Sequence, residues 1–223
     1  MTSFDHHAAV CRVCEGPTRS GFALCFCCKT IVANLQMPLA PVASVTSYRV
    51  GDSVHRLLRG YKDAPVAEAR RFCATALSSL VATWLTTHHD WLSARFGPPW
   101  NAVVAVPSSR RPGVPVDDLA AMVPHLARWH RPVLVGGRGP MDHLQADRRG
   151  FELAPDVDRE WLRGRRTLVF DDSLVTGARV QSAVAALRSG GACVIGALVV
   201  GRVMRPCPEG RTGPPAASPF SLG

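Results

Sequence analysis

Two adjacent carboxylates, Asp171 and Asp172, stand between an apolar segment and a loop of small residues. Residues 167–170 before them are apolar or β-prone, and residues 173–179 read Ser-Leu-Val-Thr-Gly-Ala-Arg. Carboxylate oxygens accept hydrogen bonds from sugar hydroxyls. The loop leads into a predicted helix, whose first N–H groups lack intrahelical partners and suit a phosphate, while Gly177 lets the backbone approach it closely. These residue types therefore predict a site for a sugar phosphate.

The segments around the loop predict a βαβ unit. The predicted helix has one apolar face, formed by Val180, Ala183, Val184 and Leu187. Gly190 and Gly191 end this helix, and a second apolar, β-branched run follows over residues 192–200. The order strand, loop, helix, strand is typical of a parallel sheet. Because ligands of open α/β sheets bind at the carboxyl ends of the strands, the loop lies where a ligand is expected.

This stretch resembles the signature by which type I phosphoribosyltransferases bind 5-phosphoribosyl 1-pyrophosphate (PRPP): a hydrophobic strand, Asp-Asp, and a loop of the Thr-Thr-Gly-Ala-Thr type. The resemblance implies that Asp171 and Asp172 hold the ribose 2′ and 3′ hydroxyls and are the catalytic residues. It implies that the loop from Thr176 to Arg179 holds the 5′-phosphate. The PRPP-binding residues implied in this stretch are Asp171, Asp172, Ser173, Val175, Thr176, Gly177, Ala178 and Arg179.

Two loop positions depart from the family pattern. Val175 stands where the first loop Thr is usual and Arg179 where the last one is usual. Two hydroxyl donors are therefore lost and one cation is gained. The alternative interpretation of the carboxylates is a solvated pair at the end of an ordinary strand.

Four cysteines near the N-terminus have the spacing of metal ligands. Cys11-x-x-Cys14 is followed, after ten intervening residues, by Cys25-x-x-Cys28. Two such pairs bring four thiolates to one tetrahedral ion, which for a four-cysteine set in the cytosol is most often zinc. Cys27 could replace Cys28, although the spacing favours Cys25 with Cys28. We expect a structural zinc ion that has no open position for catalysis.

Composition and charge limit the function classes. No run of eighteen apolar residues exists, and residues 1–9 contain no signal-like hydrophobic region, so we expect a cytoplasmic protein with no membrane contact and no disulfide framework. The formal net charge is +9, and Lys29 and Lys62 are the only lysines among the 26 basic residues. The excess of arginine suits phosphate ligands and could suit nucleic acid, but the charge is dispersed and lacks interleaved aromatic residues.

Residues 48–62 predict a basic helix with an apolar face. That face consists of Val54, Leu57, Leu58 and Tyr61. On composition alone this is a surface helix. Zinc knuckles followed by Tyr48, a basic helix and Lys62 resemble the ComF/GntX family, whose members join a four-cysteine zinc finger to a phosphoribosyltransferase-like domain. The resemblance spans residues 11–200, and it implies an accessory role in competence, in which the knuckles and the basic helix contact single-stranded DNA or a DNA-uptake helicase.

A second predicted strand, residues 101–107, also runs into groups that suit a phosphate. The hydroxyls of Ser108 and Ser109 and the guanidinium of Arg110 offer donors for a diphosphate. Their position resembles the family's pyrophosphate loop, although residues 113–119 replace the usual Arg-Gly-Phe-Asn-Gln. Asp117 is interpreted as the N-cap of a helix that extends to Trp129.

Three further segments complete the expected fold. Residues 65–91 predict one long amphipathic helix, which His88 and His89 end as solvated side chains rather than as metal ligands. Residues 132–135 predict a short strand. Residues 142–151 resemble the mobile hood of the family, with Gln145, Arg148 and Arg149 as candidate substrate contacts; an exposed charged loop is the alternative.

The sequence therefore predicts an α/β fold, with a type I phosphoribosyltransferase-like parallel sheet flanked by helices and a small N-terminal zinc-ribbon-like module. The expected divisions are a four-cysteine zinc-finger module (1–37), a linker with the basic helix (38–64), a phosphoribosyltransferase-like domain (65–204) and a disordered tail (205–223).

Three functions follow from these patterns. The chain transfers a phosphoribosyl group from PRPP, with Mg²⁺ bound by PRPP itself, to a nitrogenous acceptor; or it binds PRPP as a regulator without turnover; or it assists DNA uptake. No residue indicates the acceptor base or the oligomeric state.

Overall fold

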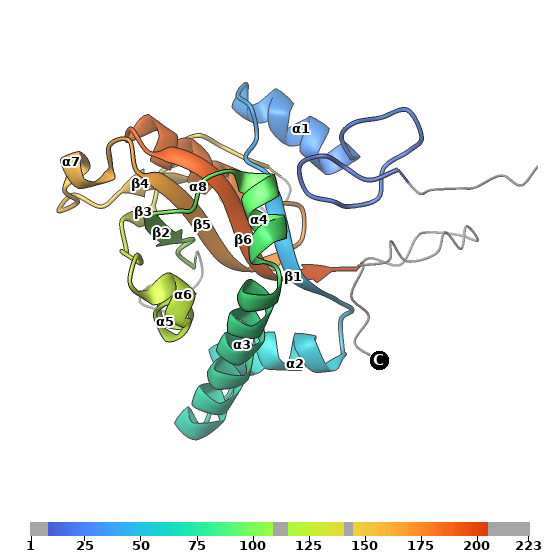
Figure 1. Ribbon diagram of the computed structural model, residues 1–223, viewed down its shortest axis with the longest axis vertical. Coiled ribbons are helices and arrows are strands. Elements are labelled where there is room, and N and C mark those ends of the chain that lie inside the picture. The colour runs from blue at the N-terminus through green and yellow to red at the C-terminus, as the bar shows by residue number, and fades with distance from the viewer. Residues whose placement is uncertain (1–8, 109–115, 141–144, 205–223) are drawn as a thin grey trace, which may run out of the picture.

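The computed structural model describes residues 9–108, 116–140 and 145–204. At its centre lies a four-stranded sheet in the order β1-β6-β5-β2, in which every neighbouring pair is parallel. The four strands are β1 (Val42–Tyr48), β2 (Ala102–Ala105), β5 (Arg166–Leu174) and β6 (Cys193–Val203). Helices flank the sheet on both faces, so the predicted α/β architecture is confirmed (Figure 1).

The predicted βαβ unit is β5, the helix α8 (Ala178–Ser189) and β6. All four residues of the predicted apolar helix face are buried, because α8 packs on the sheet. Gly190 is the C-cap of this helix, and an added Cβ there would lie 2.6 Å from Leu153 Cδ1, so a larger residue would have to displace the leucine side chain. This unit carries the candidate loop to the carboxyl edge of the sheet.

Each face of the sheet has its own hydrophobic core. On one face lie α8, α1 (Phe26–Leu35) and a two-stranded antiparallel sheet of β3 (Leu134–Gly136) and β4 (Phe151–Leu153). The other face is covered by α2 (Ser53–Asp63), α3 (Ala67–Thr87), α4 (His89–Phe96), α5 (Val116–Met122) and α6 (Pro124–Ala127). A short helix, α7 (Arg159–Leu162), precedes β5. No helix among the described residues is both long and apolar enough to cross a bilayer.

Part of the predicted linker is a strand. Residues 42–48 form β1, which pairs with β6 from Val42 opposite Ala197 to Tyr48 opposite Val203. The segment follows several prolines and alanines, and its buried side chains do not alternate regularly with less buried ones, so its composition favoured a linker. The segment after the cysteine module therefore belongs to the central sheet.

The predicted long helix of residues 65–91 is two helices, because α3 ends at Thr87 and α4 begins at His89. Between them, the His88 ring stacks on Trp84 with the ring centroids 4.5 Å apart. His88 Nδ1 also lies 2.8 Å from the Trp84 carbonyl oxygen, which accepts from the His88 backbone N–H at 2.9 Å.

The helix predicted to run from Asp117 to Trp129 is likewise two helices, divided at Val123 before Pro124, whose ring cannot donate a backbone hydrogen bond. The interpretation of Asp117 as an N-cap is wrong. Asp117 is the second residue of α5, and its Oδ1 lies 2.9 Å from His130 Nε2.

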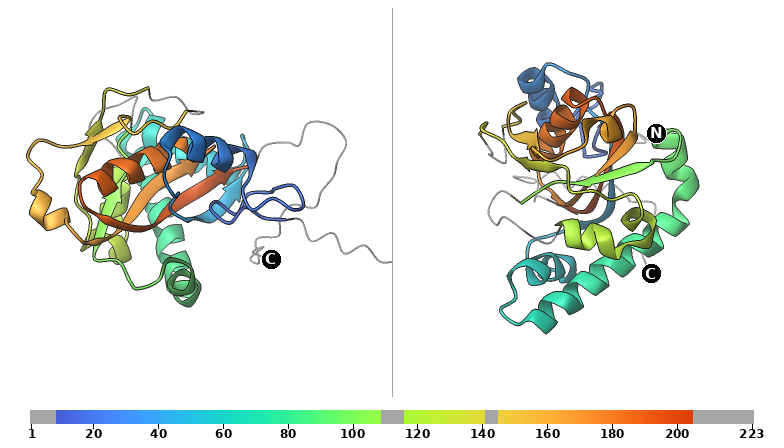
Figure 2. Two further views of the ribbon diagram at one scale, coloured as in Figure 1. Left: turned by 90° about the horizontal axis from the view of Figure 1, so that it is seen from above. Right: turned by 90° about the vertical axis from the view of Figure 1, so that its left-hand side faces the viewer.

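The N-terminal cysteine module packs against α8 through α1, and the two helices lie side by side in both views of Figure 2. Gln181 of α8 accepts from the Ala40 N–H at 3.0 Å and donates to the Ala40 carbonyl at 2.8 Å. Arg148 donates to the carbonyl oxygens of Leu35 at 2.6 Å and Gln36 at 3.0 Å, at the C-terminus of α1. The module is therefore tied to the helix that follows the candidate loop.

Candidate functional site

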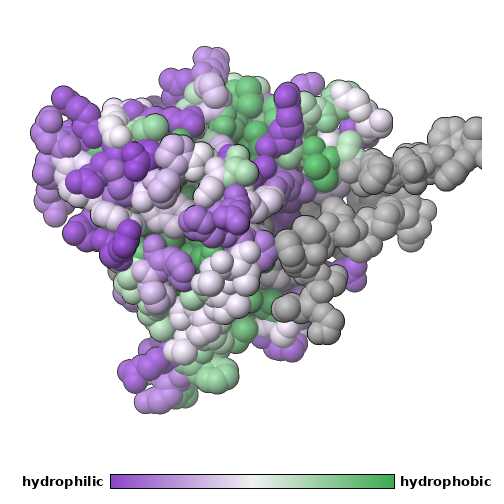
Figure 3. Space-filling view, in the orientation of Figure 1, coloured by the Kyte–Doolittle hydropathy of each residue, from purple (hydrophilic) through white to green (hydrophobic). Residues whose placement is uncertain are grey.

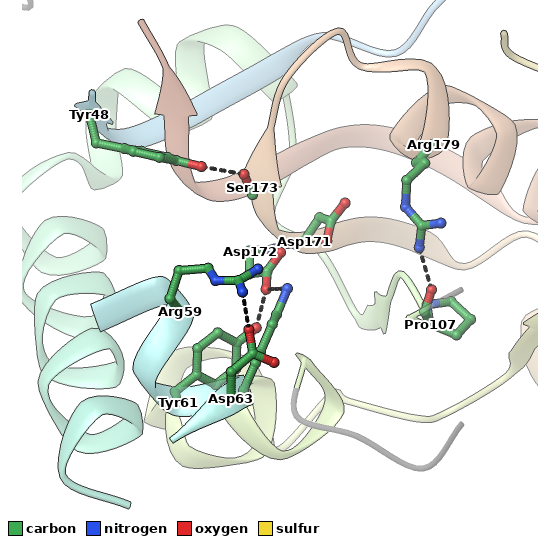
Figure 4. A network of polar contacts seen from close by, with 10 residues as sticks. Tyr48, Arg59, Tyr61, Asp63, Pro107, Asp171, Asp172, Ser173 and Arg179 are labelled. Carbon is green, nitrogen blue, oxygen red and sulfur yellow. Dashed lines mark hydrogen bonds and ion pairs between the residues drawn. The ribbon is translucent and has the colours of Figure 1, made fainter. Parts of the chain in front are cut away.

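The two carboxylates lie inside the last part of β5, since the strand continues to Leu174. Asp171 is 6% exposed and Asp172 is 4% exposed. Successive side chains of a strand point to opposite faces. Figure 4 shows this divergence: the Asp171 carboxyl group points to the side of Arg179, and the Asp172 carboxyl group points to α2. The sequence predicted one shared site for the two groups, between the strand and the loop, whereas the structure gives each its own surroundings.

Asp172 is held by two consecutive residues of α2. Tyr61 donates its hydroxyl to Asp172 Oδ2 (Figure 4), and Lys62 Nζ forms an ion pair with the same oxygen. Tyr61 is buried, and burial together with the Asp172 carboxylate raises its pKa above the ordinary value, so the phenol stays a donor. The basic helix is therefore one wall of the site rather than only a surface helix.

Local interactions fix the position of α2. Asp52 caps its N-terminus by accepting from the His55 N–H at 2.8 Å, and Asp52 also accepts from the Arg49 N–H at 2.8 Å. Near its C-terminus, Arg59 pairs with Asp63 at 2.9 Å. These contacts hold α2 as a formed helix beneath the carboxyl end of β5.

Asp171 has the surroundings of a carboxyl group that titrates near neutrality. Burial, with the neighbouring Asp172 carboxylate, raises the pKa of Asp171 to about 7, and Arg179 opposes this shift. The Asp172 N–H donates to Asp171 Oδ1 at 2.8 Å. At neutral pH the pair can therefore hold or release one proton.

The loop after β5 gives α8 an open N-terminus. Gly177 adopts the left-handed conformation with φ 90°, which places its backbone as the N-cap without a side-chain cap. The Ala178 N–H donates to Thr176 Oγ1 at 3.3 Å. A small cavity of about 30 Å³ is lined by Asp171 and residues 173–180. The predicted phosphate-binding residues and Asp171 therefore share one cavity.

Arg179 joins this loop to the end of β2. Its Nη2 donates to the Pro107 carbonyl at 2.6 Å, and its guanidinium lies 5.4 Å from the centre of the Phe151 ring. Its Nη1 is buried and has no hydrogen-bond acceptor among the residues that the structure describes. A buried guanidinium nitrogen of this kind suits an anionic oxygen. Ser108 follows Pro107, whereas Ser109 and Arg110 lie outside the described residues.

Two tyrosines at this edge escaped the sequence analysis as functional groups. Tyr61 was assigned only to an apolar helix face, and Tyr48 only to the segment that resembles the ComF/GntX pattern. Tyr48 is the last residue of β1, and its hydroxyl lies 2.6 Å from Ser173 Oγ (Figure 4). A buried tyrosine needs a hydrogen-bond partner for its hydroxyl. A tyrosine on an apolar helix face or strand therefore indicates a polar contact, which the sequence could have suggested.

The predicted hood residues have different positions. Arg148 binds the end of α1, as described above, so its guanidinium is already engaged there. Arg149 is exposed, with its Nε 3.6 Å from Asp147 Oδ1, and Gln145 is exposed. None of the contacts that the structure records for these three described residues involves Asp171 or Asp172.

The four predicted metal ligands converge. The Sγ atoms of Cys11, Cys14, Cys25 and Cys28 all lie within 4.8 Å of one another. Cys25 caps α1, its Sγ accepting from the Cys28 N–H at 3.5 Å, and Cys27 is not part of the cluster. Hydrogen bonding to Cys14 and Cys25, with burial, raises the pKa of the Cys28 thiol above its ordinary value. Four close thiols need a cation in order to ionise together, so the set fits a tetrahedral ion such as zinc.

Comparison with known proteins adds little to this geometry. No protein-family model matches the chain, and no curated protein matches it. A solved structure described as "structure of the allosteric regulatory enzyme of purine biosynthesis" is similar at 20% sequence identity, over 60% of this chain and 28% of that one, with a TM-score of 0.35. The chain thus spans less than a third of that protein, and a likeness this weak leaves the ligand to be inferred from the site itself.

Proposed function

We propose that the chain binds PRPP at the carboxyl end of β5 and transfers its phosphoribosyl group to a nitrogenous acceptor. One observation carries the proposal: the buried carboxylate of Asp171 shares one small cavity with a left-handed glycine and the N-terminus of α8, and a second buried carboxylate, Asp172, is its neighbour in β5. A carboxylate pair suits a diol, and bare backbone amides suit a phosphate. A sugar phosphate presents both groups at neighbouring positions.

The 5′-phosphate has a place at the N-terminus of α8. Gly177 brings the backbone N–H groups to the ligand, and Thr176 adds a hydroxyl at the same turn. Val175 and Arg179 replace the two usual loop threonines, so two hydroxyl donors are absent. Arg179 supplies a guanidinium instead, and its buried Nη1 can donate to a phosphate oxygen. The departure from the Thr-rich loop therefore exchanges hydroxyl donors for a guanidinium.

The two carboxylates have different roles in this proposal. Asp171 lines the same cavity as the phosphate-binding loop, so it takes a ribose hydroxyl. Asp172 shares one oxygen with Tyr61 and Lys62, which leaves its second oxygen for the neighbouring hydroxyl. Lys62 and Arg179 together balance the two carboxylates, so an anionic ligand meets a site of low net charge.

Transfer would proceed by displacement at the anomeric carbon, with positive charge developing on the ribose. Mg²⁺, when bound with PRPP, neutralises the departing pyrophosphate. Within the chain, Asp171 and Asp172 orient the ribose and oppose the developing charge, while the α8 N-terminus fixes the phosphate. Ser108, Ser109 and Arg110 are proposed to contact the pyrophosphate.

Calorimetric titration of PRPP with Mg²⁺ tests this function. Wild type should bind in the micromolar range, on the order of 8 kcal/mol. Asp171→Asn with Asp172→Asn should weaken binding at least about tenfold, since charged acceptors contribute the stronger hydrogen bonds. The matched control is Asp156→Asn, an exposed carboxylate outside the site. Absence of binding in wild type contradicts the proposal, whereas binding without pyrophosphate release in the presence of any nitrogenous base supports the regulatory form.

A DNA-uptake role is the second candidate, and the net charge of +9 favours it. On α2, however, Arg59 pairs with Asp63, and Arg56 donates to the Gly51 carbonyl at 2.6 Å. Binding to a single-stranded oligonucleotide should weaken steeply with salt if phosphates are contacted. Undetectable or salt-insensitive binding excludes this candidate.

A further inference from the structure

A second and larger cavity, of about 400 Å³, opens at the other end of the sheet. It lies between the junction of α3 and α4 on one side and α6 on the other, with Trp100 just before β2 and Ile195 near the start of β6. Because the strands are parallel, these residues mark the amino ends, whereas Asp171 lies near the carboxyl end of β5. None of the described residues lines both cavities.

The walls of this amino-end pocket are apolar and aromatic. They include Leu85, Leu92, Phe96, Trp100, Trp129 and Ile195. Phe96 packs directly on the sheet, where a Cβ at Gly196 would lie 2.7 Å from the ring. The wall therefore depends on glycine at this strand position. Figure 3 shows hydrophobic residues reaching the surface in this area, between α6 and the helices α3 and α4.

The titratable side chains of the pocket are basic. His89, His125 and Arg128 line it, and no Asp or Glu is among its described lining residues. The Arg128 guanidinium lies 4.5 Å from the centre of the Trp129 ring, so a cation stands over an aromatic face. His125 Nε2 lies 3.2 Å from Thr86 Oγ1, and His89 is next to Asp90, which does not line the pocket.

We propose that the amino-end pocket binds a small, flat, apolar anion of the aromatic carboxylate or sulfonate class. The volume lies in the range of sites that enclose small organic ligands, about 300–1,000 Å³. Aromatic walls favour a flat ring, the Arg128 guanidinium favours a negative charge on it, and the two histidines add ring N–H donors. The proposal does not depend on the proposed PRPP site, because none of its residues belongs to that site.

Two fluorescent probes that differ in charge test the proposal on the full chain. 8-Anilino-1-naphthalenesulfonate is flat, apolar and anionic, and N-phenyl-1-naphthylamine is its neutral counterpart. The sulfonate should bind at one saturable site. Arg128→Ala should weaken the sulfonate about fivefold, as expected for an exposed charge pair supported by a ring, and leave the neutral probe unchanged. Arg159→Ala, an exposed arginine on α7, is the matched control.

A variant that fills the pocket separates this site from unspecific probe binding. Ser93 lines the pocket from α4 and is half-buried, so Ser93→Trp should abolish binding of both probes while the far-UV circular dichroism stays that of wild type. Arg128→Ala, at the surface, decides the charge preference even if Ser93→Trp does not fold. Equal sulfonate binding in wild type and Arg128→Ala overturns the proposal. So does sedimentation showing a dimer that Ser93→Trp converts to monomer, because the pocket is then an interface between copies.

Discussion

The two ends of the central sheet differ in what fills the space between the elements. At the carboxyl end, Asp172 pairs with Tyr61 and Lys62, and Arg179 reaches Pro107, so charged side chains leave a cavity of about 30 Å³. At the amino end, apolar side chains leave a cavity of about 400 Å³. The larger cavity therefore lies at the amino end of the sheet, and the buried carboxylates lie at the carboxyl end. The smaller cavity has the groups that can orient a sugar phosphate, and the larger one has the shape that suits an apolar ligand.

The largest expected effect is that of zinc removal from the cysteine module, which should change ligand binding at the carboxyl end of the sheet and not at the amino end. In small zinc peptides the ion contributes about 10–16 kcal/mol to folding, so its removal should unfold the module. Since α1 packs against α8, PRPP binding should weaken, while sulfonate binding at the amino end should persist. Metal analysis should find one equivalent of zinc in wild type and less in Cys14→Ser.

Less than half an equivalent of zinc in gently purified wild type contradicts the metal site. Equal PRPP affinity before and after chelation contradicts the link between the module and α8. The exposed cysteine Cys193 offers the matched control, Cys193→Ser, which should keep the metal.

The next effect concerns the pH dependence of stability. The raised pKa of Asp171, about 7, means that between about pH 4 and pH 7 the folded state keeps a proton that the unfolded state has released. The free energy of unfolding should therefore fall as pH rises through this window, by on the order of 1–3 kcal/mol, and then level off. Urea denaturation at several pH values measures this slope. Asp171→Asn should remove most of this pH dependence. An unchanged slope in Asp171→Asn would show that another group causes the pH dependence.

A smaller effect is expected on the free energy of unfolding when either tyrosine at the carboxyl end is replaced by phenylalanine. Tyr61→Phe removes a donor from the buried Asp172 carboxylate and should destabilise the fold by about 1–2 kcal/mol. Tyr48→Phe removes a neutral hydrogen bond to Ser173 and should cost less, about 0.5–1 kcal/mol. Urea denaturation at pH 7 gives both values. A larger loss of stability in Tyr48→Phe than in Tyr61→Phe contradicts the expectation that a carboxylate acceptor makes the Tyr61 hydrogen bond the stronger of the two.

Local patterns predicted the elements that lie near each other in the chain. The helical periodicity from Val180 to Leu187 and the paired C-x-x-C motifs sufficed for α8 and the cysteine cluster, because each depends on spacing within one segment. Residues 42–48 were misread because a short strand flanked by proline gives little periodicity. The break at His88 is accompanied by stacking of its ring on Trp84, a contact that composition does not reveal.

Contacts between distant segments could not be predicted from local patterns. Tyr61 and Asp172 are 111 residues apart, and only the folded sheet brings α2 under β5. The same holds for Arg179 and Pro107, which are 72 residues apart. The amino-end pocket gave no sequence signal, because its lining comes from several separate segments.

The most direct test of the account locates PRPP on the molecule by amide and indole NMR. With PRPP and Mg²⁺, shifts should concentrate at residues 175–179 and at the β6 residues opposite Asp171 and Ser173, Val199 and Gly201. The indole signals of Trp100 and Trp129 should stay unchanged. Shifts confined to these tryptophans, or no shifts at all at saturating PRPP, contradict a sugar phosphate site at the carboxyl end of β5.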